Sequence, residues 1–188
     1  MASQEWHDRK KFLDGFIKPI PATVNTYDID LFELDSIMER YSKYGYTVDM
    51  NPDYQRGHVW TLEQKIHYIE NMLRFKLKPE IKINFPNYHD DDVKPLNGLD
   101  KNVITCIDGL QRYTALTEFV NREFKIFDGN LAVEDLLCSP YSFKSLCCNI
   151  QIYSLMDKNE LLQFYIDLNS GGTYHTPDEI DRVKKMKI

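Results

Sequence analysis

The chain has 188 residues, of which 43% are hydrophobic and 28% charged, so it can bury a core without crosslinks, and extensive disorder is excluded. Its formal net charge of −6 disfavours general nucleic-acid binding, while still permitting a local basic site for one small phosphorylated ligand. No segment approaches the roughly 20 apolar residues of a membrane span, so we expect no membrane contact. The 4 cysteines form no CxxC pair, so we expect reduced thiols in a cytoplasmic protein.

Residues 1–26 are predicted to be an N-terminal arm, because the turn-like Lys-Pro-Ile-Pro sequence ends near their boundary. Residues 27–188 are predicted to form one domain. Apolar residues recur at helical spacing between 27 and 44, which predicts a helix that stops before Gly45. A short strand is expected at 46–50.

Thr61 and Gln64 have the spacing of a capping box, which predicts a helix beginning at residue 62. The alternating sequence at 80–85 predicts a strand. Residues 103–107 form a continuous apolar or β-branched run, which is typical of a buried strand. A turn at Asp108-Gly109 then leads into a helix over about 110–121.

The C-terminal third contains two expected short strands, at 124–127 and 149–155. Asp157 and Thr176 are predicted N-caps of two further helices, because each is followed by Glu three residues later. The first of these helices is expected to run to about residue 168. Helices that alternate with short strands in this way predict an α+β fold built on a small sheet.

The segment Asp108–Arg112 is the main candidate for chemistry. A helix that begins after Gly109 presents unpaired backbone N–H groups, which suit a phosphate. Arg112 adds a planar, permanently charged fork for phosphate oxygens, and Asp108 is placed to hold Mg²⁺ or orient water. The alternative is that Asp108-Gly109 is an ordinary turn and Arg112 a solvated helix residue.

Two other segments are weaker candidates. The sequence around Gln55 and Arg56 places a second cation among aromatic residues, although it also fits a structural aromatic cluster. Asn169 and the pair Gly171-Gly172 would bring an amide and mobile backbone against a ligand, although they also fit a helix C-cap and loop. We expect all three segments to line one concave surface, because Arg112 alone supplies one cation and a phosphorylated ligand in an acidic protein needs a second one to offset its charge.

Taken together, YQRGHVW at 54–60, IDGLQRYTAL at 107–116 and LNSGGTYHTPDEI at 168–180 resemble the N-terminal domain of GmrSD-type, modification-dependent restriction systems. The resemblance runs from about residue 27 to the C-terminus. It implies a fold similar to ParB and sulfiredoxin, together with nucleoside triphosphate binding and Mg²⁺-dependent hydrolysis. The family's Asp-Gly-Gln-Gln-Arg motif matches here except at Leu110, where an apolar side chain replaces an amide, which puts nucleotide choice or turnover in question.

The resemblance assigns roles to individual positions. Asp108, Gln111 and Arg112 are expected to be catalytic, with Asp108 also the metal ligand. The residues expected to bind the nucleotide or its phosphates are Gln55, Arg56, Gly109, Leu110, Asn169, Gly171 and Gly172.

Three functions follow in order of preference. The first is a phosphoanhydride hydrolase connected with defence, phage or mobile elements. The second is a non-catalytic module that binds a protein partner, such as a restriction complex. Cleavage of DNA is the least favoured, because none of the 5 histidines belongs to a cluster like that of an HNH nuclease.

Overall fold

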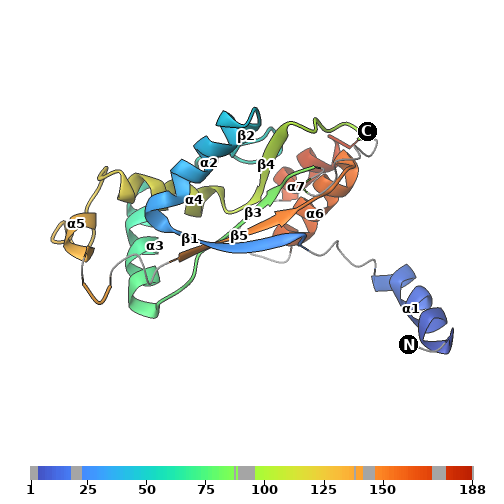
Figure 1. Cartoon of the computed structure of the whole chain (residues 1–188), viewed down its shortest axis with the longest axis horizontal. Helices are drawn as coiled ribbons and strands as arrows, with labels where there is room; N and C mark the ends of the chain where they lie inside the picture. Colours follow the sequence, from blue (N-terminus) through green and yellow to red (C-terminus); the bar gives the residue numbers. More distant parts are fainter. Residues whose placement is uncertain are drawn as a thin grey trace.

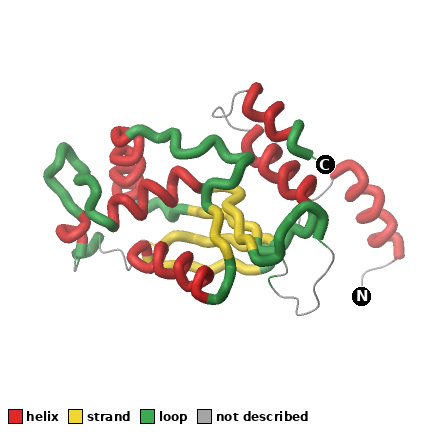
Figure 2. Tube along the Cα trace, turned by 90° about the horizontal axis from the view of Figure 1, so that it is seen from above, coloured by secondary structure: helices red, strands yellow, loops and turns green. Residues whose placement is uncertain are grey.

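The computed structural model has an α+β architecture, with helices packed against one five-stranded sheet (Figure 1, Figure 2). It describes residues 4–17, 23–86, 88, 96–137, 139–141, 147–170 and 177–187. The helices are α1 (Gln4–Ile17), α2 (Leu34–Lys43), α3 (Leu62–Phe75), α4 (Leu110–Val120), α5 (Val133–Leu136), α6 (Lys158–Ser170) and α7 (Pro177–Lys184). The strands are β1 (Asn25–Asp30), β2 (Thr47–Asp49), β3 (Glu80–Asn84), β4 (Val103–Asp108) and β5 (Cys147–Tyr153).

The sheet has the strand order β1-β5-β3-β4-β2 and mixes parallel with antiparallel pairs. β3 lies at its centre, antiparallel to β4 and parallel to β5. The register of β3 against β4 shifts between Lys82 and Ile83, which brings Lys82 opposite Asp108 at the end of β4. The shift therefore sets a lysine beside the carboxylate that begins the main predicted motif.

Two apolar cores lie on opposite faces of the sheet. Adjacent strand residues point to opposite faces, and Ile152 belongs to one core while Tyr153 belongs to the other. The larger core joins the sheet to α2, α3 and α4, whereas the smaller one joins it to α6 and α7. The β4–α4 junction lies between them, since Ile104 packs in the first core and Ile107 in the second.

The predicted helix at 27–44 is wrong in its first part. Tyr27 and Ile29 belong to β1, where they pair with Ile150 and Cys148 of β5. Polar residues alternate with these two along β1, and that period of two is the strand pattern. A 3-10 turn at Leu31–Glu33 then leads into α2, which ends before Gly45 as predicted.

The predicted strand at 124–127 is also wrong. Within the described part of this segment only Ile126 forms a bridge, to Leu131. Phe127 and Asp128 have positive φ angles, so the chain turns back at once and no strand can extend. The strand predicted at 149–155 exists as β5, but it begins two residues earlier, at Cys147.

The helix starts agree with the capping predictions where they can be compared. The Thr61 side chain accepts the Gln64 N–H, while the Gln64 side chain accepts the Thr61 N–H, which completes the capping box. Asp157 accepts the N–H groups of Asn159 and Glu160 at the start of α6. Thr176 lies outside the described residues, although α7 begins directly after it.

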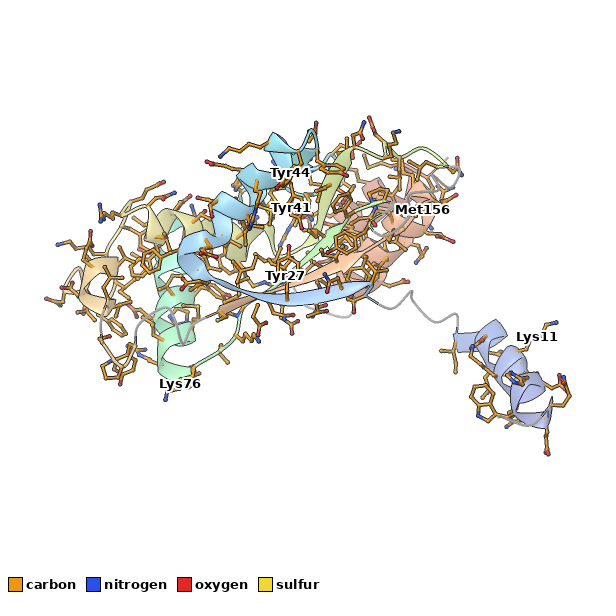
Figure 3. All side chains as sticks on the ribbon, viewed as in Figure 1. Lys11, Tyr27, Tyr41, Tyr44, Lys76 and Met156 are labelled. Carbon is orange, nitrogen blue, oxygen red and sulfur yellow. The ribbon has the colours of Figure 1, made fainter. Side chains whose placement is uncertain are left out.

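The predicted arm contains a helix of its own, α1, which has no buried residue. Figure 3 shows its side chains standing apart from the sheet and the other helices. Five of the exposed side chains are large and apolar: Trp6, Phe12, Leu13, Phe16 and Ile17. No helix in the described part of the chain is both long and apolar enough to cross a membrane.

Candidate functional site

One cavity of about 660 Å³ collects the predicted site residues. Its walls come from the loop before α3, from α3 itself, from the β4–α4 junction and from α6. Every predicted site residue that the structure describes lines this cavity, namely Gln55, Arg56, Asp108, Gly109, Leu110, Gln111, Arg112 and Asn169. The three motifs therefore meet on one concave surface, as the sequence predicts, while Gly171 and Gly172 lie outside the described residues.

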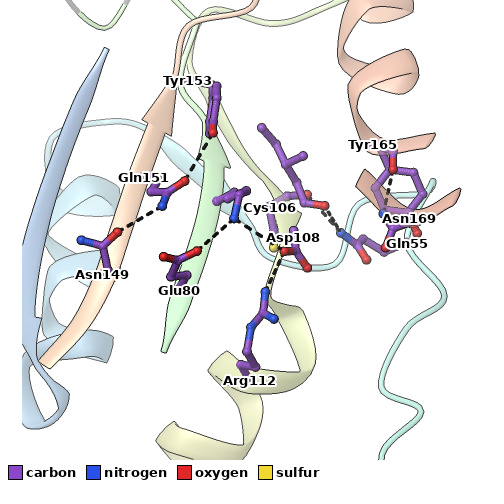
Figure 4. Close-up of polar contacts among 12 residues, drawn as sticks. Gln55, Glu80, Cys106, Asp108, Arg112, Asn149, Gln151, Tyr153, Tyr165 and Asn169 are labelled. Carbon is purple, nitrogen blue, oxygen red and sulfur yellow. Dashed lines mark hydrogen bonds and ion pairs between the residues drawn. The ribbon is translucent and has the colours of Figure 1, made fainter. Parts of the chain in front are cut away.

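Asp108 and Arg112 form an ion pair at the floor of the cavity. The Arg112 Nη2 donates to Asp108 Oδ2 at 2.7 Å, and Figure 4 shows Arg112 reaching back along α4 toward the end of β4. The Lys82 Nζ lies 3.9 Å from the same oxygen. Burial lowers the pKa of Arg112, but the Asp108 charge and hydrogen bond outweigh burial and raise that pKa above its ordinary value. Arg112 therefore stays cationic although it is largely enclosed.

Gly109 is required by the backbone of the protein itself. Its φ of +108° lies in the left-handed region, and an added Cβ would lie 3.0 Å from the Glu80 carbonyl oxygen and 3.1 Å from the Ile81 Cα. The sequence predicts that Gly109 binds a ligand, and the close approach that the structure contains at this glycine is to β3. The glycine thereby sets α4 directly against the centre of the sheet.

Gln111 holds the loop before α3 in place. Its Oε1 accepts the N–H groups of Val59 and Trp60 at 3.1 Å each, and its Nε2 donates to the Gly57 carbonyl at 2.5 Å. Both atoms of the amide are thus engaged by backbone. The side chain that the family resemblance made catalytic has a clear positioning role, because it fixes Trp60 at the edge of the cavity.

Leu110 is one of the residues that line the cavity, although it is only 3% exposed and also contributes apolar packing. That Leu110 contacts a nucleotide stays a prediction. An amide at this buried position would need hydrogen-bond partners, and leucine avoids that requirement.

Gln55 belongs to a loop that is fastened to both β4 and α7. Its Nε2 donates to the carbonyls of Cys106 and Ile107, at 3.3 Å and 3.1 Å. On the other side, the Arg182 guanidinium donates to three successive carbonyls, of Asp53, Tyr54 and Gln55, at 2.9–3.2 Å. The loop carrying the first motif is therefore positioned by α7, which no local sequence pattern indicates.

Arg56 brings the second cation to the cavity. Its side chain is 24% exposed, and its Nη1 lies 3.7 Å from Glu179 Oε2 on α7. Asn169 lines the α6 side, where its Nδ2 donates to the Tyr165 carbonyl at 2.7 Å (Figure 4). His58 of the same loop is exposed and contacts Thr114 on α4 at 3.0 Å, which gives it a structural hydrogen bond.

The α3 wall of the cavity was not identified from the sequence. Gln64, Tyr68 and Asn71 occur at spacings of four and three, so they share one helix face, and His67 lies beside them. Trp60 stands against this face, its ring centroid 5.2 Å from that of Tyr68. The signal was present as a polar and aromatic stripe opposite the apolar stripe of α3.

The charged groups of the cavity fit a phosphorylated ligand better than a protein-bound metal. The described residues contain no group of three His, Cys, Asp or Glu side chains placed to hold a metal ion. Among the described residues that line the cavity, Asp108 is the only carboxylate. Mg²⁺ is commonly held by one or two carboxylates together with substrate phosphates, so Asp108 fits a metal that arrives with a nucleotide.

Comparison with known families identifies the family of this chain. Residues 34–147, more than half of the chain, match the family described as "GmrSD restriction endonuclease, N-terminal domain". The matched segment contains the loop before α3 and the β4–α4 junction, but it ends before α6. Curated proteins and solved structures give no match, so the likeness to ParB and sulfiredoxin stays a prediction.

Proposed function

This chain belongs to the family of GmrSD restriction endonuclease N-terminal domains, and from that premise we propose that its cavity binds a nucleoside triphosphate and hydrolyses it with Mg²⁺. One observation carries the proposal: Arg56, Arg112 and the start of α4 face a single cavity in a chain that is otherwise acidic. The family is one of restriction proteins, so the chain is related to restriction and defence.

The positive groups suit phosphate oxygens. Arg112 donates one hydrogen bond to Asp108, and a guanidinium has five N–H groups, so it retains donors for a phosphate. Its Nε is buried and has no hydrogen-bond partner among the described residues. Arg56 would hold a second phosphate, and the first-turn N–H groups of α4 would add partial positive charge.

Hydrolysis would proceed mainly through electrostatic stabilisation. Mg²⁺, held by Asp108 and the phosphates, would neutralise charge on the transferring group. Asp108 would also orient the water whose oxygen attacks the γ-phosphorus as the bond to the β-phosphate oxygen breaks. Arg112 and Arg56 would stabilise the charge that gathers on the phosphate oxygens.

A second candidate is a non-catalytic interaction module that keeps the fold. Two observations favour it: Gln111 makes three hydrogen bonds that hold the loop, and α1 exposes large apolar side chains that would suit a protein partner. This reading predicts no phosphate release, with or without nucleotide binding.

Calorimetry with ATP, GTP, CTP and UTP, each with and without Mg²⁺, separates the two functions when phosphate release is measured in parallel. The hydrolase predicts binding, Mg²⁺-dependent release of phosphate, and loss of that release in Asp108→Asn. Binding without release would favour the module. No binding of any nucleotide would overturn the nucleotide proposal.

A further inference from the structure

We propose that the α3 wall of the cavity, together with Trp60 beside it, is a subsite for the nucleobase. The residues of this wall that would meet the base are His67, Tyr68 and Asn71. The inference rests on the proposed nucleotide function. It adds recognition of the base to the phosphate binding by the charged residues of the cavity. This wall lines the same cavity as Asp108 and Arg112 but differs from them in chemistry.

The two ends of the cavity differ in charge. Asp108, Arg56 and Arg112 lie on the loop and the β4–α4 junction, whereas α3 contributes no Asp, Glu, Lys or Arg to the lining. Both parts face one ligand space, because Arg112 and Tyr68 line the same cavity. Burial raises the pKa of the Tyr68 hydroxyl, and the Arg112 charge acts in the opposite direction. A ligand with a polyanionic end and a neutral, planar end matches this division.

The aromatic part of the wall is fixed in place before any ligand binds. Trp60 and Tyr68 contact each other at 5.2 Å with a 54° angle between their planes, and both pack against the larger core. The backbone N–H of Trp60 donates to Gln111 Oε1, so the loop that carries the indole is anchored to α4. Pre-positioned aromatic rings provide stacking surfaces for any base.

The polar part of the wall can pair with the edge of a base. Asn71 Nδ2 contacts His67 Nε2 at 2.8 Å, which orients both side chains along α3. An amide offers a donor and an acceptor side by side, the arrangement that recognises base edges. The Gln64 amide, about two turns before Asn71, lines the same cavity.

The test compares tripolyphosphate, which has no base, with the four nucleoside triphosphates at one Mg²⁺ concentration. In the wild type the tightest nucleotide is expected to bind at least about tenfold more tightly than tripolyphosphate, the scale of one stacked base. Asn71→Ala removes the amide for the base edge, so it should reduce this preference at least about fivefold while leaving tripolyphosphate affinity unchanged. Asn121→Ala, at the far end of α4, is the matched control and should retain the preference.

Fluorescence gives a second readout. The chain has 2 tryptophans, so a Trp6→Phe background leaves Trp60 as the sole reporter. Nucleotide should quench it and tripolyphosphate should not. Equal affinities for both ligands in the wild type, or equal weakening of both by Asn71→Ala, would overturn the base subsite and leave the phosphate site standing. Failure of both ligands to bind would instead overturn the nucleotide function itself.

Discussion

Replacing Gln111 with alanine separates a positioning role from a catalytic one. The side chain makes three hydrogen bonds to the backbone of residues 57–60. Each intramolecular hydrogen bond contributes about 1 kcal/mol net. The Val59 N–H is exposed, so it can bond to water in the variant and its lost hydrogen bond costs less than the other two. We therefore expect Gln111→Ala to lower the free energy of unfolding by about 2–3 kcal/mol, measured by urea unfolding followed by circular dichroism.

Two further variants make the result specific. Gln111→Glu keeps the acceptor for Val59 and Trp60 but sets a carboxylate oxygen against the Gly57 carbonyl oxygen, so it should lose at least as much stability as the alanine variant. Gln163→Ala, at an exposed position of α6, should stay within about 0.5 kcal/mol of the wild type. An unchanged unfolding free energy in Gln111→Ala, together with lost nucleotide turnover, would refute the positioning role.

Three other predictions concern the surroundings of the cavity. Gly109→Ala should lose about 2 kcal/mol or more of stability in thermal melts, because its φ is +108° and a Cβ would crowd β3; an unchanged melt would contradict that backbone. Arg182→Ala should raise the nucleotide Kd about tenfold by releasing the loop at Gln55, and unchanged affinity would show that α7 does not position the loop. Burial raises the pKa of Cys148 to about 12 and that of Cys106 further, so both stay protonated at pH 8 and should resist iodoacetamide until the protein unfolds; labelling of the native protein would contradict their burial.

Local signals predicted the elements that hold the main motif. The capping box at Thr61 and the apolar run before Asp108 depend on neighbouring residues, and both appear in the structure. The strand at Tyr27 was missed because helical spacing continues across Ile29 into α2. Only pairing with β5, far along the chain, decides in favour of a strand there.

The sequence predicted which residues line the cavity better than it predicted the hydrogen bonds that those residues make. The need for a second cation predicted that Arg56 and Arg112 share one surface, and both line the cavity. The contacts of Gln111 with Gly57 and of Arg182 with the loop at Gln55 join segments far apart in sequence. Spacing carries no information on such contacts, and so it could not show that Gln111 positions the loop or that α7 supports it.

The central claim, that the cavity holds the phosphates of a nucleotide, is tested most directly by calorimetry on two arginine variants. Arg112→Ala removes the enclosed guanidinium, while Arg122→Ala removes an arginine whose side chain is 69% exposed, just beyond the other end of α4. With Mg²⁺ and the tightest of the four nucleotides, Arg112→Ala should bind at least about a hundredfold more weakly than the wild type. Arg112→Lys should also bind weakly, because an ammonium group lacks the planar fork of a guanidinium. Arg122→Ala should bind as the wild type does. Wild-type affinity in a folded Arg112→Ala protein would contradict the account.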